Sequence, residues 1–304
     1  MPDPIAPARP AARRMLVVHA HPDDETIGTG ATMAKYAAEG ADVTLVTCTL
    51  GEEGEVLVPE LAHLAADEQD ELGPHRQGEL AAAMQALGVR DWRLLGEPGR
   101  YRDSGMAGEA TNDAEGCFWR ADLLAAATDL VVVIRELRPQ VLITYDEFGG
   151  YGHPDHVQAH RVAMYAAVLA AASSFRPDLG AAWDTPKIYW TALPKSLLRR
   201  GIQALRDAGD TSPIAQMDLD GLPFGVDDDV VTTRVDAADC MPNKIAAFHS
   251  YPTQIAMDSG FFALAELADS AMAVEYYRLV RGPRGPLDAD GLESDLFAGL
   301  AEFN

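Results

Sequence analysis

Residues 15–25 read MLVVHAHPDDE, an apolar run that passes directly into a turn rich in histidine and carboxylate side chains. Residues 15–20 have the continuous apolar character of a buried strand, and residues 26–39 have that of a helix closed by Gly40. A second strand-like run covers residues 42–50. A strand, a helix and a strand in this order are the repeating unit of parallel sheets. This part of the chain therefore predicts an α/β fold.

The same alternation of strand and helix patterns continues to about residue 192. It predicts a mostly parallel, doubly wound (Rossmann-like) sheet with helices on both faces. The further elements that we expect here are helices over 61–87 (with a break at Gly73-Pro74), 121–137 and 156–173, and strands over 92–95, 141–145 and 187–191.

The pattern is looser after residue 192, but it still contains recognisable elements. We expect helices over 196–208, 237–250 and 272–280, and an edge strand over 227–235. Because no repeat or clear linker divides the chain, we expect a single domain over residues 1–304. In it, residues 1–14 form a flexible extension and residues 192–304 a C-terminal elaboration of the fold.

The composition narrows the kinds of partner that the protein can have. No apolar run is long enough to cross a bilayer, and residues 1–14 lack the apolar core of a secretion signal. The cysteines, Cys48, Cys117 and Cys240, are widely spaced and fit a reducing compartment. A net charge of −23 opposes binding to nucleic acid or to an anionic membrane. We therefore expect a cytoplasmic protein with a small-molecule partner.

The turn after the first strand carries the first part of a candidate metal site. His21 and Asp24 are three residues apart, and Pro22 fixes the backbone between them, so an imidazole and a carboxylate can point to one place. Asp23 projects beside Asp24, and two adjacent carboxylates in a low-dielectric cleft repel each other unless a cation intervenes. One carboxylate can then bind a divalent metal while the other accepts a proton from water that the metal activates.

Residues 23–25 also have a structural interpretation, because Asp and Glu are favoured before a helix, where they cap free N–H groups. For this acidic run alone, capping and metal binding fit the sequence equally well. His19 can be a buried imidazole hydrogen-bonded to the backbone, and Glu25 fits a supporting or capping role better than a ligand role. A dinucleotide-binding interpretation of residues 28–30 (GTG) fails, since Met33 stands at the third glycine position.

Residues 149–156 (GGYGHPDH) carry the second part of the candidate site. The glycines of this run allow positive φ angles and a close approach of the backbone to a substrate. His156 completes a His/Asp/His set with His21 and Asp24, and three protein ligands leave room for water and substrate, as in catalytic zinc sites. Such a set also accepts Fe²⁺.

The remaining side chains of the second run have the chemistry of catalytic groups. His153 can act as an acid or stabilise an oxyanion, and the carboxylate of Asp155 can hold it in the required tautomer. Tyr151 offers an O–H donor near a developing oxyanion. Together the two runs predict a hydrolytic metal site at the ends of two parallel strands.

Residues 19–25 and 151–156 together resemble the signature of the LmbE-like (PIG-L-like) zinc deacetylases, which include de-N-acetylases of N-acetylglucosaminyl-inositol. Further stretches are similar to the mycothiol-biosynthesis deacetylases of actinobacteria: 47–56 (TCTLGEEGEV), 99–106 (GRYRDSGM), 187–191 (KIYWT) and 293–300 (ESDLFAGL). Residues 147–148 (EF) depart from that pattern, where those enzymes have a Pro-Asn-like pair.

The resemblance implies a hydrolase that uses Zn²⁺, with Fe²⁺ as an alternative, to remove the N-acetyl group from N-acetylglucosaminyl-myo-inositol. It implies three metal ligands, which are His21, Asp24 and His156. It implies Asp23 as general base, and His153 as acid and oxyanion stabiliser. It implies that Asp155 tunes His153 and that Tyr151 assists at the oxyanion. Three residues are implied to contact the sugar or inositol, namely Glu55, Arg76 and Asp103.

Other interpretations stay open at this point. Glu55 can be an exposed loop residue, Arg76 an ordinary solvated arginine, and Asp103 a member of a local salt bridge with Arg100 or Arg102. The same motifs also suit an amidase for mycothiol S-conjugates, or a sugar-binding protein that has lost catalysis. The sequence leaves open whether the protein forms a homo-oligomer.

Overall fold

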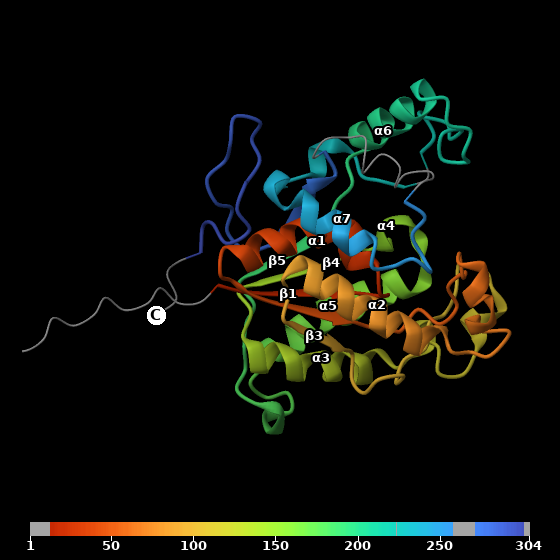
Figure 1. Ribbon diagram of the computed structural model, residues 1–304. Helices are drawn as coiled ribbons and strands as arrows, with labels where there is room; N and C mark the ends of the chain where they lie inside the picture. Colours follow the sequence, from red (N-terminus) through yellow and green to blue (C-terminus); the bar gives the residue numbers. More distant parts are fainter. Residues whose placement is uncertain (1–12, 223, 258–270, 301–304) are drawn as a thin grey trace, which may run out of the picture.

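The computed structural model describes residues 13–222, 224–257 and 271–300 (Figure 1). Its strands are β1 (Arg14–His19), β2 (Asp42–Thr47), β3 (Asp91–Leu94), β4 (Val141–Thr144), β5 (Lys187–Thr191), β6 (Thr233–Asp236) and β7 (Val274–Arg281). Its α-helices are α1 (Asp24–Ala38), α2 (Leu72–Leu87), α3 (Leu123–Leu137), α4 (Gly149–Gly152), α5 (Pro154–Ala171), α6 (Lys195–Asp207) and α7 (Met241–Phe248). Within these described ranges, no helix is both long enough and apolar enough to cross a membrane.

The strands form one seven-stranded sheet in the order β3-β2-β1-β4-β5-β7-β6. The first five of these run parallel, and Met15 of the central strand β1 pairs with Val43 on one side and Val141 on the other. β7 is antiparallel to both β5 and β6. The predicted mostly parallel sheet is confirmed, and the C-terminal part of the chain extends its edge.

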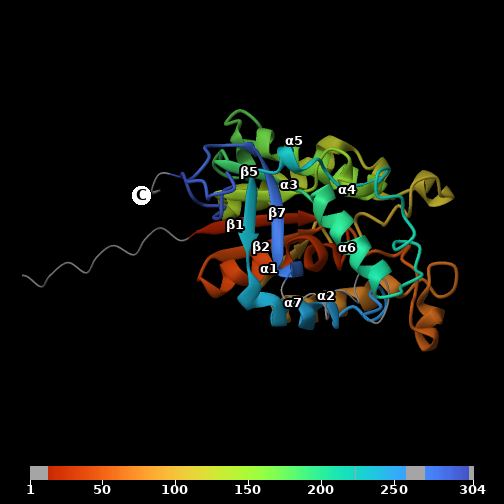
Figure 2. The same ribbon diagram turned by 90° about the horizontal axis from the view of Figure 1, so that it is seen from above.

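Helices cover both faces of the sheet, as predicted (Figure 2). α1, α2 and α7 lie on one face, where Met15 and Val17 of β1 join their apolar core. α3 and α5 lie on the other face, where Leu16 and Val18 join a second core. β1 is therefore buried on both sides, which explains its continuous apolar sequence.

The helix that we expect over residues 272–280 is wrong, because β7 occupies most of this range. Glu275 and Tyr277 are buried while their neighbours are partly exposed, which is the alternation of a strand. Antiparallel pairing with β5 and β6 determines the conformation here, and the β-branched and aromatic residues of the segment favour it.

Two further elements differ in extent from the sequence prediction. In residues 61–87 only α2 is α-helical, preceded by a 3-10 turn over Pro59–Leu64. Pro74 lies in the first turn of α2, where a missing N–H costs no helical hydrogen bond, so it marks a helix start rather than a break. The expected strand over 227–235 is the shorter β6, which does lie at the edge of the sheet.

The two histidine-rich runs follow the carboxyl ends of two neighbouring strands, β1 and β4. β1 leads into α1 on one face, and β4 leads through the short α4 into α5 on the other face, so the connections that follow these two adjacent strands diverge to opposite faces of the sheet. Crevices of this kind, at the carboxyl ends of parallel strands, are where open α/β sheets bind ligands.

Candidate active site

The turn between β1 and α1 fixes the carboxylate of Asp24. Its Oδ2 accepts hydrogen bonds from the backbone N–H of His21 at 2.9 Å and from the hydroxyl of Tyr145 at 2.8 Å. Tyr145 in turn accepts the N–H of Ala20 at 2.9 Å. Tyr145, which we did not predict as a site residue, therefore ties the end of β4 to the turn after β1.

Asp23 precedes α1 with a φ angle of 115°, a region that L-residues rarely adopt. Its side chain makes no capping hydrogen bond to the helix, so the capping interpretation does not hold for Asp23. Glu25 supports this turn instead, because its buried carboxylate accepts the N–H of Asp23 at 3.1 Å and the hydroxyl of Tyr251 at 2.7 Å. Strained backbone of this kind is typical of functional sites.

The glycines of the second run have the positive φ angles that the sequence predicts. Gly149, Gly150 and Gly152 have φ angles of 68°, 76° and 92°. A side chain at Gly149 would place its Cβ 2.7 Å from the Cβ of His156. α5 then begins after His153, whose Nδ1 accepts the backbone N–H of Asp155 at 3.1 Å.

The predicted metal ligands converge on Asp24. Its Oδ2 lies 3.2 Å from Nδ1 of His21, and its Oδ1 lies 3.2 Å from Nε2 of His156. The opposite ring nitrogens are occupied, since Nδ1 of His156 lies 3.1 Å from the Gly149 carbonyl and Nε2 of His21 lies 3.2 Å from Oδ2 of Asp155. Imidazoles that bind metals are held in this way by a carbonyl or carboxylate at the far nitrogen.

Within the described residues, the buried Nε2 atom of His156 makes no well-aligned hydrogen bond, and its polar neighbour is Oδ1 of Asp24 at 3.2 Å. Buried polar atoms normally make hydrogen bonds, so this nitrogen fits the role of a metal ligand. His21, His153 and His156 each offer a nitrogen within 4.8 Å of the others, and His21, Asp103 and Asp155 form a second such group. The cluster can therefore hold a metal ion; the first group joins His153 to the predicted ligands His21 and His156, and Asp24 is a member of neither group.

The charges in the cluster demand a positive partner. Burial disfavours a charged His21, but the carboxylates of Asp103, Asp155 and Asp24 outweigh burial and raise its pKa well above the usual value. Burial likewise raises the pKa of Asp24, but His156 and His21 outweigh it and hold this pKa well below the ordinary range. A proton on the imidazole or a bound cation can satisfy this excess of negative charge.

The pKa of Asp23 is raised and that of His153 is lowered, opposite to the shifts of Asp24 and His21. Burial raises the pKa of Asp23 to about 8; the Arg76 guanidinium opposes this rise and the charge of Asp24 adds to it. Burial, together with the nearby His21 and His156, lowers the pKa of His153 to about 3. Since Nδ1 of the neutral His153 ring accepts a hydrogen bond, its proton lies on Nε2.

The carboxylate of Asp155 does not take the place that we predicted. We expected it to hold His153, but it accepts hydrogen bonds from Ser104, through Oγ at 2.5 Å and N at 2.9 Å, and contacts Nε2 of His21. Only the backbone N–H of Asp155 reaches His153. The structure therefore makes Asp155 the partner of a predicted ligand, and Ser104 its support.

Arg76 also lies in a different environment from the predicted sugar contact. It is buried, and its guanidinium donates to Oδ2 of Asp23 at 2.9 Å, to the Gly51 carbonyl at 2.7 Å and to the carbonyl of Pro22. Gly51 has a φ of 69°, and a Cβ there would lie 1.9 Å from Arg76. Arg76 thus holds the carboxylate of Asp23 and the glycine loop together.

The other predicted sugar contacts differ from each other in exposure. Asp103 is buried, 3.4 Å from Nε2 of His21, and accepts the N–H groups of Glu53 and Gly105 at 3.2 and 2.9 Å. Arg100 and Arg102 pair with other carboxylates, which are Asp129, Glu53 and Asp70. Glu55 is exposed on the loop after β2.

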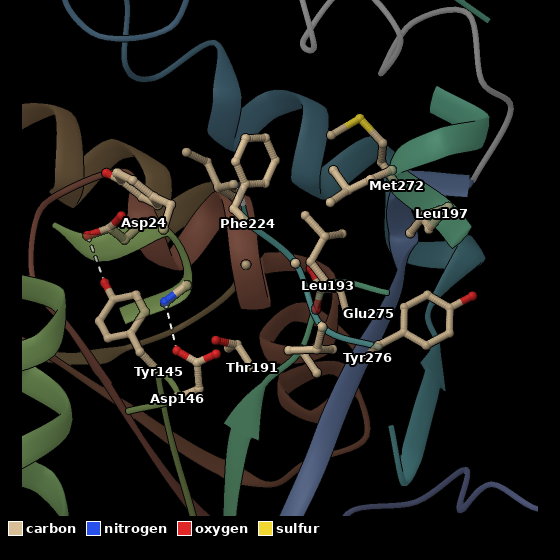
Figure 3. A pocket seen from close by; sticks show the side chains of 18 of the residues that line it. Asp24, Tyr145, Asp146, Thr191, Leu193, Leu197, Phe224, Met272, Glu275 and Tyr276 are labelled. Carbon is tan, nitrogen blue, oxygen red and sulfur yellow. Dashed lines mark hydrogen bonds between the residues drawn. The ribbon is translucent and has the colours of Figure 1, made fainter. Parts of the chain in front are cut away.

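Tyr151 lies at the rim of a pocket that begins at the cluster. Its side chain is half-exposed, and its ring lies 5.0 Å from the ring of His156. The pocket has a volume of about 590 Å³ and is lined at this end by Asp24, Tyr145 and His156 (Figure 3). His19 also lines it; its Nε2 lies 3.0 Å from the hydroxyl of Thr29 rather than from a backbone atom.

A buried His/Asp cluster at the switch point of a parallel sheet agrees with what the chain matches. Residues 16–167 match the family described as PIG-L, GlcNAc-PI de-N-acetylase, and the chain belongs to this family.

Individual relatives are similar over nearly the whole chain. It is 63% identical to 1D-myo-inositol 2-acetamido-2-deoxy-alpha-D-glucopyranoside deacetylase 1 of Catenulispora acidiphila, over 98% of this chain and 93% of that protein. It is 60% identical to the corresponding deacetylase of Geodermatophilus obscurus, over 95% of this chain and 98% of that protein. The solved N,N'-diacetylchitobiose deacetylase of Pyrococcus horikoshii shares the fold, with a TM-score of 0.61 and 18% identity over 90% of this chain and 85% of that chain.

Proposed function

We propose that this protein is a metal-dependent hydrolase that removes the N-acetyl group of 1D-myo-inositol 2-acetamido-2-deoxy-α-D-glucopyranoside, a step of mycothiol biosynthesis, in the cytoplasm. The substrate is the one named for the relatives that share 63% and 60% of its residues. The observation that carries the chemistry is the convergence of Asp24 with His21 and His156, beside the carboxylate of Asp23.

His21, Asp24 and His156 would hold the metal, through the atoms that face one another in the cluster. Two imidazoles and a carboxylate suit Zn²⁺, with Fe²⁺ as an alternative. A bound cation would supply Lewis acidity, which lowers the pKa of water and polarises an acyl carbonyl. Asp155 would keep His21 in the tautomer whose Nδ1 is free, because it contacts the opposite ring nitrogen at 3.2 Å.

Asp23 would act as the general base that accepts a proton from the attacking water. Its carboxylate is partly buried, adjacent in sequence to the predicted ligand Asp24, and it is held at Oδ2 by Arg76. The strained turn and the Glu25 carboxylate fix its backbone. A base held in this way is preorganised, so no conformational entropy is lost to orient it during the reaction.

His153 would face the developing oxyanion and donate a hydrogen bond to it from Nε2. The departing amine would take up the proton that Asp23 accepted from the water, because a neutral imidazole that lost its Nε2 proton would become an imidazolate; the role of acid therefore passes from His153 to Asp23. The neutral state of His153 fits the donor role, because a hydrogen-bond donor needs no net charge. Tyr151, at the rim of the pocket, would add an O–H donor beside it. Asp103 and Glu55 would contact sugar or inositol hydroxyls on the side of the cluster where Asp23 lies.

Acetate release from the inositol glycoside by the purified, zinc-loaded protein tests this proposal. In the Asp23→Asn variant we expect turnover to fall by about 100-fold or more, the usual contribution of a general base, with metal content unchanged. Asp178→Asn, in the exposed 3-10 turn Pro177–Leu179, is the matched control for a lost carboxylate and should behave as the unaltered protein. No acetate release by the unaltered protein, or normal turnover by Asp23→Asn, would contradict the assignment.

A further inference from the structure

The pocket beside the cluster is much larger than an acetyl group requires. Its volume of about 590 Å³ lies within the range of pockets that enclose drug-sized ligands. The methyl of an acetyl group is comparable in size to one water molecule, about 30 Å³. An acetyl group by itself would therefore fill only a small part of this space.

The walls of the pocket are mainly apolar beyond the cluster. Figure 3 shows Asp24 and Tyr145 at one end and Leu197 and Tyr276 at the other. Apolar side chains from α1, α6, β7 and the segments around them line the space between, including Ile27, Leu193, Leu197, Phe224, Met272 and Val274.

Gly28 keeps part of this space free. A Cβ built on Gly28 would lie 3.8 Å from His19 and 3.9 Å from Thr191, and both of these residues line the pocket. Any larger side chain at this position of α1 would extend into the pocket. The glycine of the GTG run thus serves a ligand space, although not that of a dinucleotide.

The two sides of the cluster differ in polarity. Asp24 and His156 belong to the pocket lining, whereas Asp23, Arg76 and Asp103 lie outside it. Hydroxyl groups of a sugar or of inositol would lose their hydrogen bonds to water against apolar walls, at a substantial free-energy cost. The sugar therefore fits the polar side, and the group on the other side of the reacting carbonyl fits the pocket.

We propose that this pocket binds the hydrocarbon chain of an N-acyl group, so that the enzyme also hydrolyses N-acyl glucosaminyl-inositols whose acyl chains are longer than acetyl. The inference rests on the proposed function, because it uses the same reaction. Water adds its oxygen to the acyl carbon, the C–N bond breaks, and the nitrogen takes up the proton. The products are the free amine and a fatty carboxylate instead of acetate.

Steady-state kinetics on N-acetyl, N-butanoyl and N-hexanoyl glucosaminyl-inositol test the proposal. Burial of each methylene can lower KM by up to about fourfold. We expect KM to fall at least about tenfold from the acetyl to the hexanoyl substrate, because the four added methylenes are buried. Leu197→Trp, which fills the pocket, should abolish this gain while acetyl hydrolysis stays unchanged. Leu193→Glu, which puts a charge into it, should do the same. Leu124→Trp, on the exposed face of α3, is the matched control and should retain the gain.

The outcomes separate this inference from the proposed function. Acetyl hydrolysis without any activity on the longer substrates would overturn the inference and leave the proposed function standing. No hydrolysis of any member would overturn both. A third arm uses a hexyl 2-acetamido glycoside in place of the inositol glycoside. If KM is lower for the hexyl glycoside than for the inositol glycoside, if Leu197→Trp removes this difference, and if KM does not fall along the acyl series, the pocket binds the aglycone. That result would overturn the acyl assignment.

Discussion

Replacement of Asp155 by asparagine tests how the structure organises the ligands. The carboxylate lies 3.2 Å from Nε2 of His21 and is fixed by two hydrogen bonds from Ser104. Asparagine keeps the shape but removes the charge, so Nε2 of His21 loses the nearer of its two carboxylate partners, and Asp103 at 3.4 Å remains. Loss of such a partner behind a metal-binding histidine weakens metal affinity by about 10–100-fold, or about 1.4–2.7 kcal/mol.

The assay is competition for Zn²⁺ between the protein and a chromogenic chelator, measured beside the rate of acetate release. We expect Asp155→Asn to bind zinc about 10–100-fold more weakly, and to recover much of its activity when zinc is in excess. Asp178→Asn should bind zinc as tightly as the unaltered protein. Unchanged zinc affinity together with lost activity would refute the reasoning, since Asp155 would then act on His153 or on the substrate.

Two further substitutions test the supports of Asp23 and Asp24. Arg76→Met removes the positive charge that lowers the pKa of Asp23, so the pKa of Asp23 should rise. Because Asp23 works as the ionised carboxylate, the acidic limb of the kcat/KM profile, where activity rises with pH, should move to higher pH. Arg76→Lys keeps a positive charge beside Asp23, so its limb should lie between those of Arg76→Met and the unaltered protein. An acidic limb that does not move in Arg76→Met would argue against the pairing of Arg76 with Asp23. Tyr145→Phe removes the hydroxyl bonded to Asp24 and leaves the buried N–H of Ala20 unpaired. Urea titration should show a loss of about 1–3 kcal/mol in the free energy of unfolding, and unchanged stability would contradict the contact.

The sequence alone reveals the part of the fold that local patterns determine. β1 and β4 are buried on both sides, so their apolar runs are continuous and easily recognised. The alternation of these strands with helices then places both histidine-rich runs at the carboxyl ends of the parallel strands. β7 was beyond this reasoning, because its conformation depends on pairing with β5 and β6, which are distant in the sequence.

The candidate site divides in the same way. The convergence of His21, Asp24 and His156 follows from motifs that sit at the ends of adjacent strands. Ser104, which binds Asp155, and Asp23, which binds Arg76, lie in loops about fifty residues from their partners, so no local pattern identifies these contacts. Tyr145 had a usable signal, because it directly follows β4 at the edge where the site forms.

A crystal structure of the zinc-loaded protein, with the ion located by its anomalous scattering, tests the central claim most directly. We expect one ion bonded to Nδ1 of His21, a carboxylate oxygen of Asp24 and Nε2 of His156, at about 2.0–2.2 Å. An ion bound instead through Nε2 of His21, together with Asp103 and Asp155, would contradict the account.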